Sequence, residues 1–260
     1  MPIIHTVRGR HRSGPHVFIA IPCHGEISAP TFVSFFEGAQ FLDALGFNIT
    51  LCVEAGNCHV DDARNSLVRR FIDTQCTDFV FIDADVGFRC EDLHKLVTVD
   101  RDIVAGVYPK KDDNEEFPVM VMPGEALWSD KDGLVEVLGV PTGFLRIKRD
   151  VLVNLYNKAL HFTGSGGPLG MTYGVIFERG IQEGRRMSGD YAFCAKARAA
   201  GYRIFVDPEM QFSHTGAKTW SGTLGKWWKA QYIKPRPTLI ERFKGYVAAC
   251  KADARRELNY

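Results

Sequence analysis

The chain has 260 residues, of which 45% are hydrophobic and 24% are charged, and its formal net charge is +1. This size and composition allow a sizeable core in one large domain or two small ones. The nearly balanced charge excludes a polyelectrolyte and gives no sign of nucleic-acid binding by itself. No apolar run reaches the ~18 residues of a membrane span. We interpret residues 1–15 as a basic lead-in, because they lack the apolar core of a signal peptide.

The cysteines point to a reducing compartment. There are 7 of them, scattered along the chain, and no Cys-x-x-Cys pair occurs. This pattern favours free thiols over a disulfide framework or a zinc site. We therefore expect a cytoplasmic protein.

Apolar strands alternate with amphipathic helices in the first part of the chain. The pattern predicts strands over 17–21, 48–53, 78–82 and 103–107, and helices over 31–45, 61–74 and 91–97. This alternation predicts an α/β fold with a mainly parallel central sheet. In such sheets, ligands bind at the carboxyl ends of the strands.

The second half is more mixed and predicts a smaller antiparallel portion. We expect strands over 117–122, 134–138, 142–147 and 202–206, helices over 150–157 and 189–200, and a flexible loop over 163–170. No segment has the composition of an interdomain linker. The sequence therefore predicts one Rossmann-like domain over 16–216, followed by an extension over 217–260.

The sharpest motif is a hydrophobic strand that ends in two acids, Phe79-Val80-Phe81-Ile82-Asp83-Ala84-Asp85. Residues two apart in an extended chain point to the same side, so both carboxylates face one site. Carboxylate oxygens suit Mg²⁺ or Mn²⁺, and these ions leave coordination positions open for substrate phosphates. The alternative is a solvated turn with two acids. The hydrophobicity of the strand favours a metal site.

Upstream of this motif lies a helix start, Asp61-Asp62-Ala63-Arg64-Asn65. The chain resembles the GT-A glycosyltransferase superfamily in its order of elements, which is strand, helix, strand, helix and strand followed by Asp-x-Asp. The Ala-Arg-Asn start is similar to that of fungal Golgi mannosyltransferases and of related bacterial and viral enzymes. The resemblance covers roughly residues 16–216. It implies transfer of a sugar from a nucleotide-diphosphate sugar, with UDP favoured and GDP possible, to an acceptor hydroxyl.

The resemblance also assigns residues to the donor site. It implies that Pro22 receives the nucleoside, that Glu54 meets the base or ribose, and that Arg64 and Asn65 face the nucleotide or its phosphates. An arginine near a helix N-terminus is suited to an anion, although a surface arginine packed along its helix has the same sequence signature. Gly143 is expected in the sugar pocket, because a glycine allows close approach to the backbone.

The resemblance further implies a metal set and an acceptor-side acid. Asp83, Asp85 and His214 are expected to hold Mn²⁺ or Mg²⁺, with Asp85 taking part in catalysis and Asp83 also contacting the donor. Asp190 is expected to act as a general base on the acceptor hydroxyl or to bind the acceptor, or simply to cap a helix. The related enzymes more often carry Glu-Asp at that helix start, whereas this chain has Gly189 before Asp190.

The C-terminal part mixes basic and aromatic residues. This composition suits a lid over the donor, an acidic glycan or lipid-linked acceptor, or a modified base in DNA, and it also suits an amphipathic helix packed on the core. The residues concerned are Lys218, Trp220, Lys226, Trp227, Trp228, Lys229, Tyr232, Lys234, Arg236, Arg242 and Lys244.

Three functional hypotheses follow from the sequence. The first is a metal-dependent glycosyltransferase. The sequence leaves its stereochemistry open. A base at Asp190 predicts inversion of the anomeric configuration, whereas the Ala-Arg-Asn pattern favours retention. The second is a nucleotide-sugar or glycan-binding module of the same fold without turnover. The third, a nucleotidyltransferase, is disfavoured because residues 22–26 do not form a glycine-rich phosphate loop.

Overall fold

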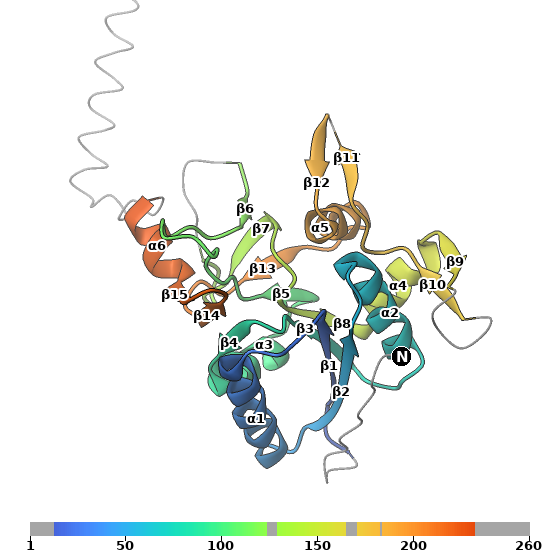
Figure 1. Cartoon of the computed structure of the whole chain (residues 1–260), viewed down its shortest axis with the longest axis horizontal. Coiled ribbons are helices and arrows are strands. Elements are labelled where there is room, and N and C mark those ends of the chain that lie inside the picture. Colours follow the sequence, from blue (N-terminus) through green and yellow to red (C-terminus); the bar gives the residue numbers. More distant parts are fainter. Residues whose placement is uncertain (1–12, 124–128, 165–170, 183, 232–260) are drawn as a thin grey trace, which may run out of the picture.

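A computed structural model of the chain describes residues 13–123, 129–164, 171–182 and 184–231 (Figure 1). The first half contains β1 (His16–Cys23), α1 (Ala29–Ala44), β2 (Asn48–Ala55), α2 (Val60–Ile72), β3 (Asp78–Ile82), β4 (Val86–Phe88), α3 (Cys90–Thr98) and β5 (Ile103–Ala105). The next elements are β6 (Met120–Val121), β7 (Val135–Gly139), β8 (Phe144–Lys148), α4 (Arg149–Lys158), β9 (His161–Thr163) and β10 (Thr172–Gly174). The last are β11 (Gly180–Gln182), β12 (Arg185–Met187), α5 (Gly189–Ala199), β13 (Ile204–Val206), β14 (Gln211–Thr215), β15 (Thr219–Thr223) and α6 (Leu224–Gln231).

The central sheet has eight strands in the order β2-β1-β3-β8-β5-β13-β7-β6. The pairs β1–β2, β1–β3 and β13–β5 are parallel, whereas β8 runs antiparallel to both β3 and β5. β7 is antiparallel to β13 and β6. All strands except β8 and β7 therefore run in one direction. The prediction of a mainly parallel α/β sheet in a Rossmann-like domain is confirmed.

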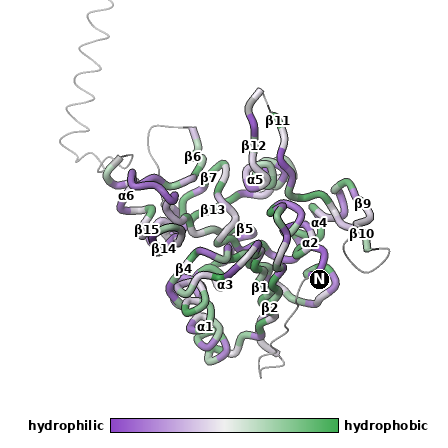
Figure 2. The backbone as a smooth tube through the Cα atoms, viewed as in Figure 1, coloured by the Kyte–Doolittle hydropathy of each residue, from purple (hydrophilic) through white to green (hydrophobic). Residues whose placement is uncertain are grey.

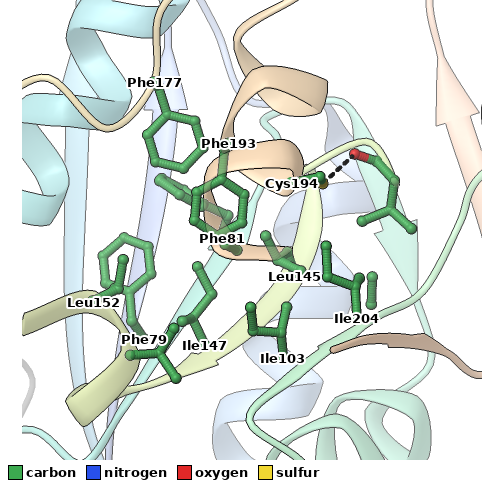
Figure 3. Close-up of a cluster of buried hydrophobic side chains, with 14 of the residues drawn as sticks. Phe79, Phe81, Ile103, Leu145, Ile147, Leu152, Phe177, Phe193, Cys194 and Ile204 are labelled. Atoms are coloured by element: carbon green, nitrogen blue, oxygen red, sulfur yellow. Dashed lines mark hydrogen bonds between the residues drawn. The ribbon is translucent and has the colours of Figure 1, made fainter. Parts of the chain in front are cut away.

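Side chains of the central strands alternate between two hydrophobic layers. In β3, Phe79 and Phe81 join the layer formed with α2, α4 and α5, whereas Val80 and Ile82 join the layer formed with α1 and α3. Figure 3 shows Phe79 and Phe81 packed among side chains of β8, α4 and α5. Hydrophobic residues gather along β1 and β2 in Figure 2. Both faces of β3 are therefore buried, which explains the continuous apolar sequence of this strand.

A smaller antiparallel sheet has the order β15-β14-β4. β14 pairs with β4 directly after the Asp-x-Asp motif, and the amide of Thr215 donates to the carbonyl of Asp85 at 2.9 Å. This sheet ties the end of the described chain to the predicted metal site. α6 then packs on the core through Leu224 and the fully buried Trp228. The amphipathic-helix interpretation holds for α6, whereas residues 232–260 lie outside the described part.

For most elements of the first half, the predicted first and last residues lie within three residues of the observed ones. The sequence did not predict β4, β9–β12, β14 or β15, all of which have three to five residues. The basic lead-in falls largely on residues 1–12, and most of the predicted flexible loop falls on 165–170, so both lie outside the described residues. Among the described helices, none is both long enough and apolar enough to cross a membrane.

Candidate functional site

A cavity of about 330 Å³ lies at the carboxyl ends of β1, β2 and β3. Three loops form its wall, and the first turn of α2 closes one side. This volume lies in the range of small-molecule sites, and the place is the one where parallel α/β sheets bind ligands. Its lining residues are Pro22, Cys23, His24, Gly25, Glu26, Asn57, Cys58, Val60, Ala63, Asp83, Ala84 and Asp85. Pro22, Asp83 and Asp85 were predicted from the sequence.

Asp83 faces inward, toward buried groups. Its carboxylate accepts hydrogen bonds from Arg64 at 3.2 and 3.4 Å and from the hydroxyl of Tyr108 at 3.0 Å. Burial, together with the negative charge of Asp83, raises the pKa of Tyr108 well above its usual value, so the phenol stays protonated and donates. The backbone amide of Asp83 donates to the carbonyl of Gly143 at 2.9 Å.

Gly143 lies against the Asp83 carboxylate. A Cβ at this position would come within 2.2 Å of Asp83 Oδ2 and 2.3 Å of the Tyr108 hydroxyl oxygen. Real Cβ atoms do not approach so closely, so any side chain here displaces the carboxylate. The predicted requirement for glycine therefore has a different cause from the one expected: Gly143 makes room for Asp83.

Arg64 connects the motif to Asp190. Its guanidinium, only 5% exposed, donates to Asp190 as well as to Asp83, and the hydroxyl of Thr142 donates to Asp190 at 2.9 Å. Burial opposes the charge on Arg64, but Asp190 and Asp83 outweigh it and raise the pKa of Arg64, which keeps the cation. Ser188, at the N-cap of α5, makes no side-chain capping bond. The structure thus links Asp190 to Asp83 through Arg64, and its predicted role at the acceptor stays a prediction.

Asp85 faces the opposite side, toward β14. Lys111 Nζ lies 2.5 Å from its Oδ2, and His214 Nε2 lies 3.6 Å from its Oδ1. Burial works against ionisation of Asp85, but His214 and Lys111 prevail and lower its pKa to about 2. The pairing of His214 with Val86 across β14 and β4 places the imidazole here. Two predicted metal ligands therefore lie side by side.

The tautomer of His214 fits a metal ligand. Its Nδ1 lies 2.8 Å from the carbonyl of Pro109, which can only accept, so Nδ1 carries the proton. Loss of the Nε2 proton would leave a lone pair beside the Asp85 carboxylate, so that the two side chains together could hold a divalent ion. Within the described ranges, however, no three His, Cys, Asp or Glu side chains converge on one point. Asp83 is turned toward Arg64 and away from this pair.

Two predicted donor residues lie elsewhere. The buried side chain of Asn65 donates to the carbonyl of Phe177 at 2.7 Å and accepts from the amides of Ile176 and Phe177 at 3.0 and 2.9 Å. Its amide therefore fixes a loop instead of contacting a donor. Glu54 is buried and absent from the cavity wall, but it accepts from Asn57, which is part of that wall, at 3.2 Å.

The space beside Gly189 is filled by another acid. A Cβ at Gly189 would lie 2.0 Å from Oδ1 of Asp61, whose carboxylate also pairs with Arg179 at 3.0 Å. Asp61 comes from the first turn of α2, and Gly189 begins α5. The carboxylate of Asp61 therefore occupies the space that a side chain at position 189 would need.

Sequence reasoning missed Lys111 altogether and considered Tyr108 only as one possible lining residue of the donor pocket. Both follow β5, and the end of that strand was a usable signal, because it meets the same edge of the sheet as the end of β3. The contact partners themselves lie 25 or more residues away, which no local pattern reveals.

A second cavity, of about 440 Å³, lies between α4 and α5 and is mostly apolar. Its charged lining residues are Lys158, Lys196 and Glu178, of which Lys196 and Glu178 pair with each other. No aspartate lines this cavity, whereas Asp83 and Asp85 line the first one.

The comparisons with known proteins support the fold. No protein-family model matches this chain, and no curated protein sequence does. Solved structures, however, do match. The chain shares its fold with A197 from STIV. The two are 16% identical with a TM-score of 0.52, and the match covers 81% of this chain and 91% of A197. At this identity, the likeness speaks for the fold alone.

A glycosyltransferase involved in the glycosylation of the major capsid of PBCV-1 also matches, at 15% identity. The match covers 54% of this chain and 63% of that one, with a TM-score of 0.32. Such a low score carries no argument, so the functional assignment depends on the geometry of the site.

Proposed function

We propose that this protein is a metal-dependent glycosyltransferase that transfers a sugar from a nucleotide-diphosphate sugar to a hydroxyl group. The observation that carries the proposal is the cavity at the ends of β1–β3, which has both acids of the Asp-x-Asp motif in its wall and His214 beside the second acid. An ordinary surface turn would not place two acids, a histidine and a buried arginine around one strand end.

The donor would occupy the cavity, with its nucleoside against Pro22 and its phosphates near the start of α2. Val60 and Ala63, from the first turn of α2, line the cavity, and the N-terminus of a helix favours phosphate. Asp83 would contact the donor sugar or ribose, because Arg64 and Tyr108 hold its carboxylate at the cavity wall. We favour UDP as the nucleotide, with GDP as the other candidate.

Asp85 and His214 would hold Mn²⁺ or Mg²⁺, and phosphate oxygens of the donor would supply further ligands. When bound, the ion neutralises charge that develops on the departing diphosphate. Asp190 would accept a hydrogen bond from the acceptor hydroxyl, since Thr142 and Arg64 fix its carboxylate. We propose a glycan, a lipid-linked glycan or a modified DNA base as the acceptor.

Slow hydrolysis of nucleotide-sugars tests the proposal. EDTA should abolish release of free sugar, and added Mn²⁺ should restore it. Asp85→Asn should lower this rate by about 100-fold or more, because it removes a direct metal ligand. Circular dichroism should show the variant folded. A thermal-shift panel of UDP-, GDP- and TDP-sugars with and without Mn²⁺ would identify the donor, because a bound ligand stabilises the folded state.

A non-catalytic binding module is the second candidate. The observation that favours it is the ammonium of Lys111 on Asp85, where a catalytic ion would otherwise bind. A folded wild-type chain that is stabilised by a nucleotide-sugar but releases no sugar under any metal condition would establish this alternative. Turnover that persists unchanged in EDTA would contradict the metal-dependent mechanism.

A further inference from the structure

Lys111 already places a positive charge where the proposed ion would bind. Its Nζ is 2.5 Å from Asp85 Oδ2, and both side chains are partly open to solvent, at 35% and 38% exposed. Lys111 lies on Oδ2 and His214 faces Oδ1 of the same carboxylate, so an ion held through Oδ1 and His214 would lie beside the ammonium, and the two positive charges would repel each other. Binding of an ion at Asp85 and His214 would therefore favour release of Lys111 from its partner.

The route by which Lys111 reaches Asp85 is built into the hairpin of β14 and β15. Gly216 lies in the turn of this hairpin, and a Cβ there would come within 3.0 Å of Lys111 Cδ. The aliphatic part of the lysine thus crosses the turn where no side chain blocks it. Gly216 also donates its amide to the carbonyl of Lys218 at 2.7 Å, which closes the turn.

The segment that carries Lys111 is anchored on both sides of the lysine. Lys110 Nζ lies 2.6 Å from Glu116 Oε2 within the segment. Asp113 accepts from Trp220 Nε1 at 3.1 Å and pairs with Lys218, so the segment is fixed to β15. The backbone around Lys111 is thereby held in place, while its flexible side chain can leave Asp85 without moving the loop.

From these contacts we propose that Lys111 is a displaceable cation that couples binding of the metal ion to binding of the donor diphosphate. This inference rests on the proposed function. Without a nucleotide, Lys111 competes with the ion for Asp85, and free metal binds weakly. When a diphosphate arrives with the ion, its oxygens accept the released ammonium, which is a compact and mobile charge suited to phosphate. Ion and diphosphate therefore bind better together than separately.

Titration of Mn²⁺, followed by electron paramagnetic resonance or calorimetry, tests this proposal without any turnover. With no nucleotide present, Lys111→Met should bind Mn²⁺ about fivefold more tightly than wild type, which corresponds to removal of one partly exposed competing ion pair. Saturating UDP should then strengthen Mn²⁺ binding in wild type and much less in Lys111→Met.

Two variants serve as controls. Lys110→Met removes an equal charge one residue away that pairs with Glu116 and not with Asp85, so it should match wild type. Asp85→Asn should lose Mn²⁺ binding in both conditions. Equal or weaker Mn²⁺ binding in Lys111→Met would overturn the proposal, and so would the absence of Mn²⁺ binding from all of these proteins.

Failure here is distinguishable from failure of the proposed function. A chain that hydrolyses a nucleotide-sugar with Mn²⁺, yet shows no difference between wild type and Lys111→Met, keeps the glycosyltransferase function and loses this inference. A chain with the expected Mn²⁺ and UDP coupling, but no sugar release, keeps the inference and is a binding module.

Discussion

The two acids of the Asp-x-Asp motif lie in contrasting environments. Asp83, 21% exposed, is held by the buried Arg64 and by Tyr108. Asp85, 38% exposed, contacts Lys111 and His214 near the surface. The contacts of Asp83 resist substitution, because removal of either partner leaves a buried charge of Arg64 or Asp83 without compensation. The open side can exchange one cation for another at little cost.

This difference assigns separate roles to two residues of one short motif. The α2 side, formed by Arg64, Asp83 and Asp190, keeps the cavity wall in shape. Under the proposed function, the β14 side, formed by Asp85, Lys111 and His214, is where cations would exchange. Loss of stability should therefore follow mutation on the first side, and loss of ion binding should follow mutation on the second.

The largest effect is expected for Arg64→Met. The variant leaves Asp83 and Asp190 close together without their shared cation, so we expect the free energy of unfolding to fall by about 3–5 kcal/mol. Urea denaturation measures this. Arg69→Met, on the same helix, removes an exposed pair with Asp73 and should cost less than about 1 kcal/mol. Similar losses of stability for the two variants would show that the buried contacts of Arg64 stabilise the fold no more than the ion pair of Arg69 with Asp73.

Asn65→Ala should come next, with a loss of about 2–3 kcal/mol, because two amides and one carbonyl of residues 176–177 lose their partner. Asn57→Ala, which removes a single hydrogen bond at the cavity rim, should cost about 1 kcal/mol or less. Unchanged stability in Asn65→Ala, combined with weaker donor binding in a thermal-shift titration, would restore the donor contact that the sequence predicted.

Gly143→Ala should lower the free energy of unfolding by about 2 kcal/mol, since the added methyl group overlaps the Asp83 carboxylate. Gly180→Ala adds the same methyl group where nothing lies within 4 Å and should be nearly neutral. Chemical denaturation of both variants measures the difference. Equal stability of Gly143→Ala and wild type would mean that Asp83 moves freely, contrary to the rigid side described above.

The smallest effect on stability is expected for Asp85→Asn, within about 1 kcal/mol at pH 7. The pKa of Asp85 is lowered from 3.8 to about 2, so its ion pairs stabilise the fold above about pH 4 and lose this contribution as the pH falls toward 2. Urea denaturation at several pH values should show a small advantage of wild type over Asp85→Asn at neutral pH that vanishes in acid. If the stability advantage of wild type over Asp85→Asn grew as the pH falls, the expected direction of the pH dependence would be wrong.

The sequence predicted the framework of this molecule better than its contacts. β3 and the acids at its end were recognisable because a strand buried on both faces has a continuous apolar sequence. β4 and β14 were missed because short strands of mixed composition depend on pairing with a distant partner. His214 was expected beside the motif, through the resemblance and its place after β13, and its Nε2 lies 3.6 Å from Asp85 Oδ1. Its role as a metal ligand stays a prediction.

Side-chain roles that depend on long-range packing could not be predicted. Asn65 was expected at the donor, but a loop more than 100 residues later takes up its amide. Trp228 was considered as part of a lid over the donor or of an acceptor site, yet it is fully buried in the core. In both cases the local sequence is compatible with either role, and the decision is made by a partner far along the chain.

The contact between Gly189 and Asp61 has an evolutionary consequence. A side chain at 189 and a carboxylate at 61 exclude each other, because they claim the same space. The two positions should therefore vary together in homologous chains: where 189 is larger than glycine, 61 should not be aspartate. Such covariation would show that the junction between the starts of α2 and α5 has room for only one of these two side chains.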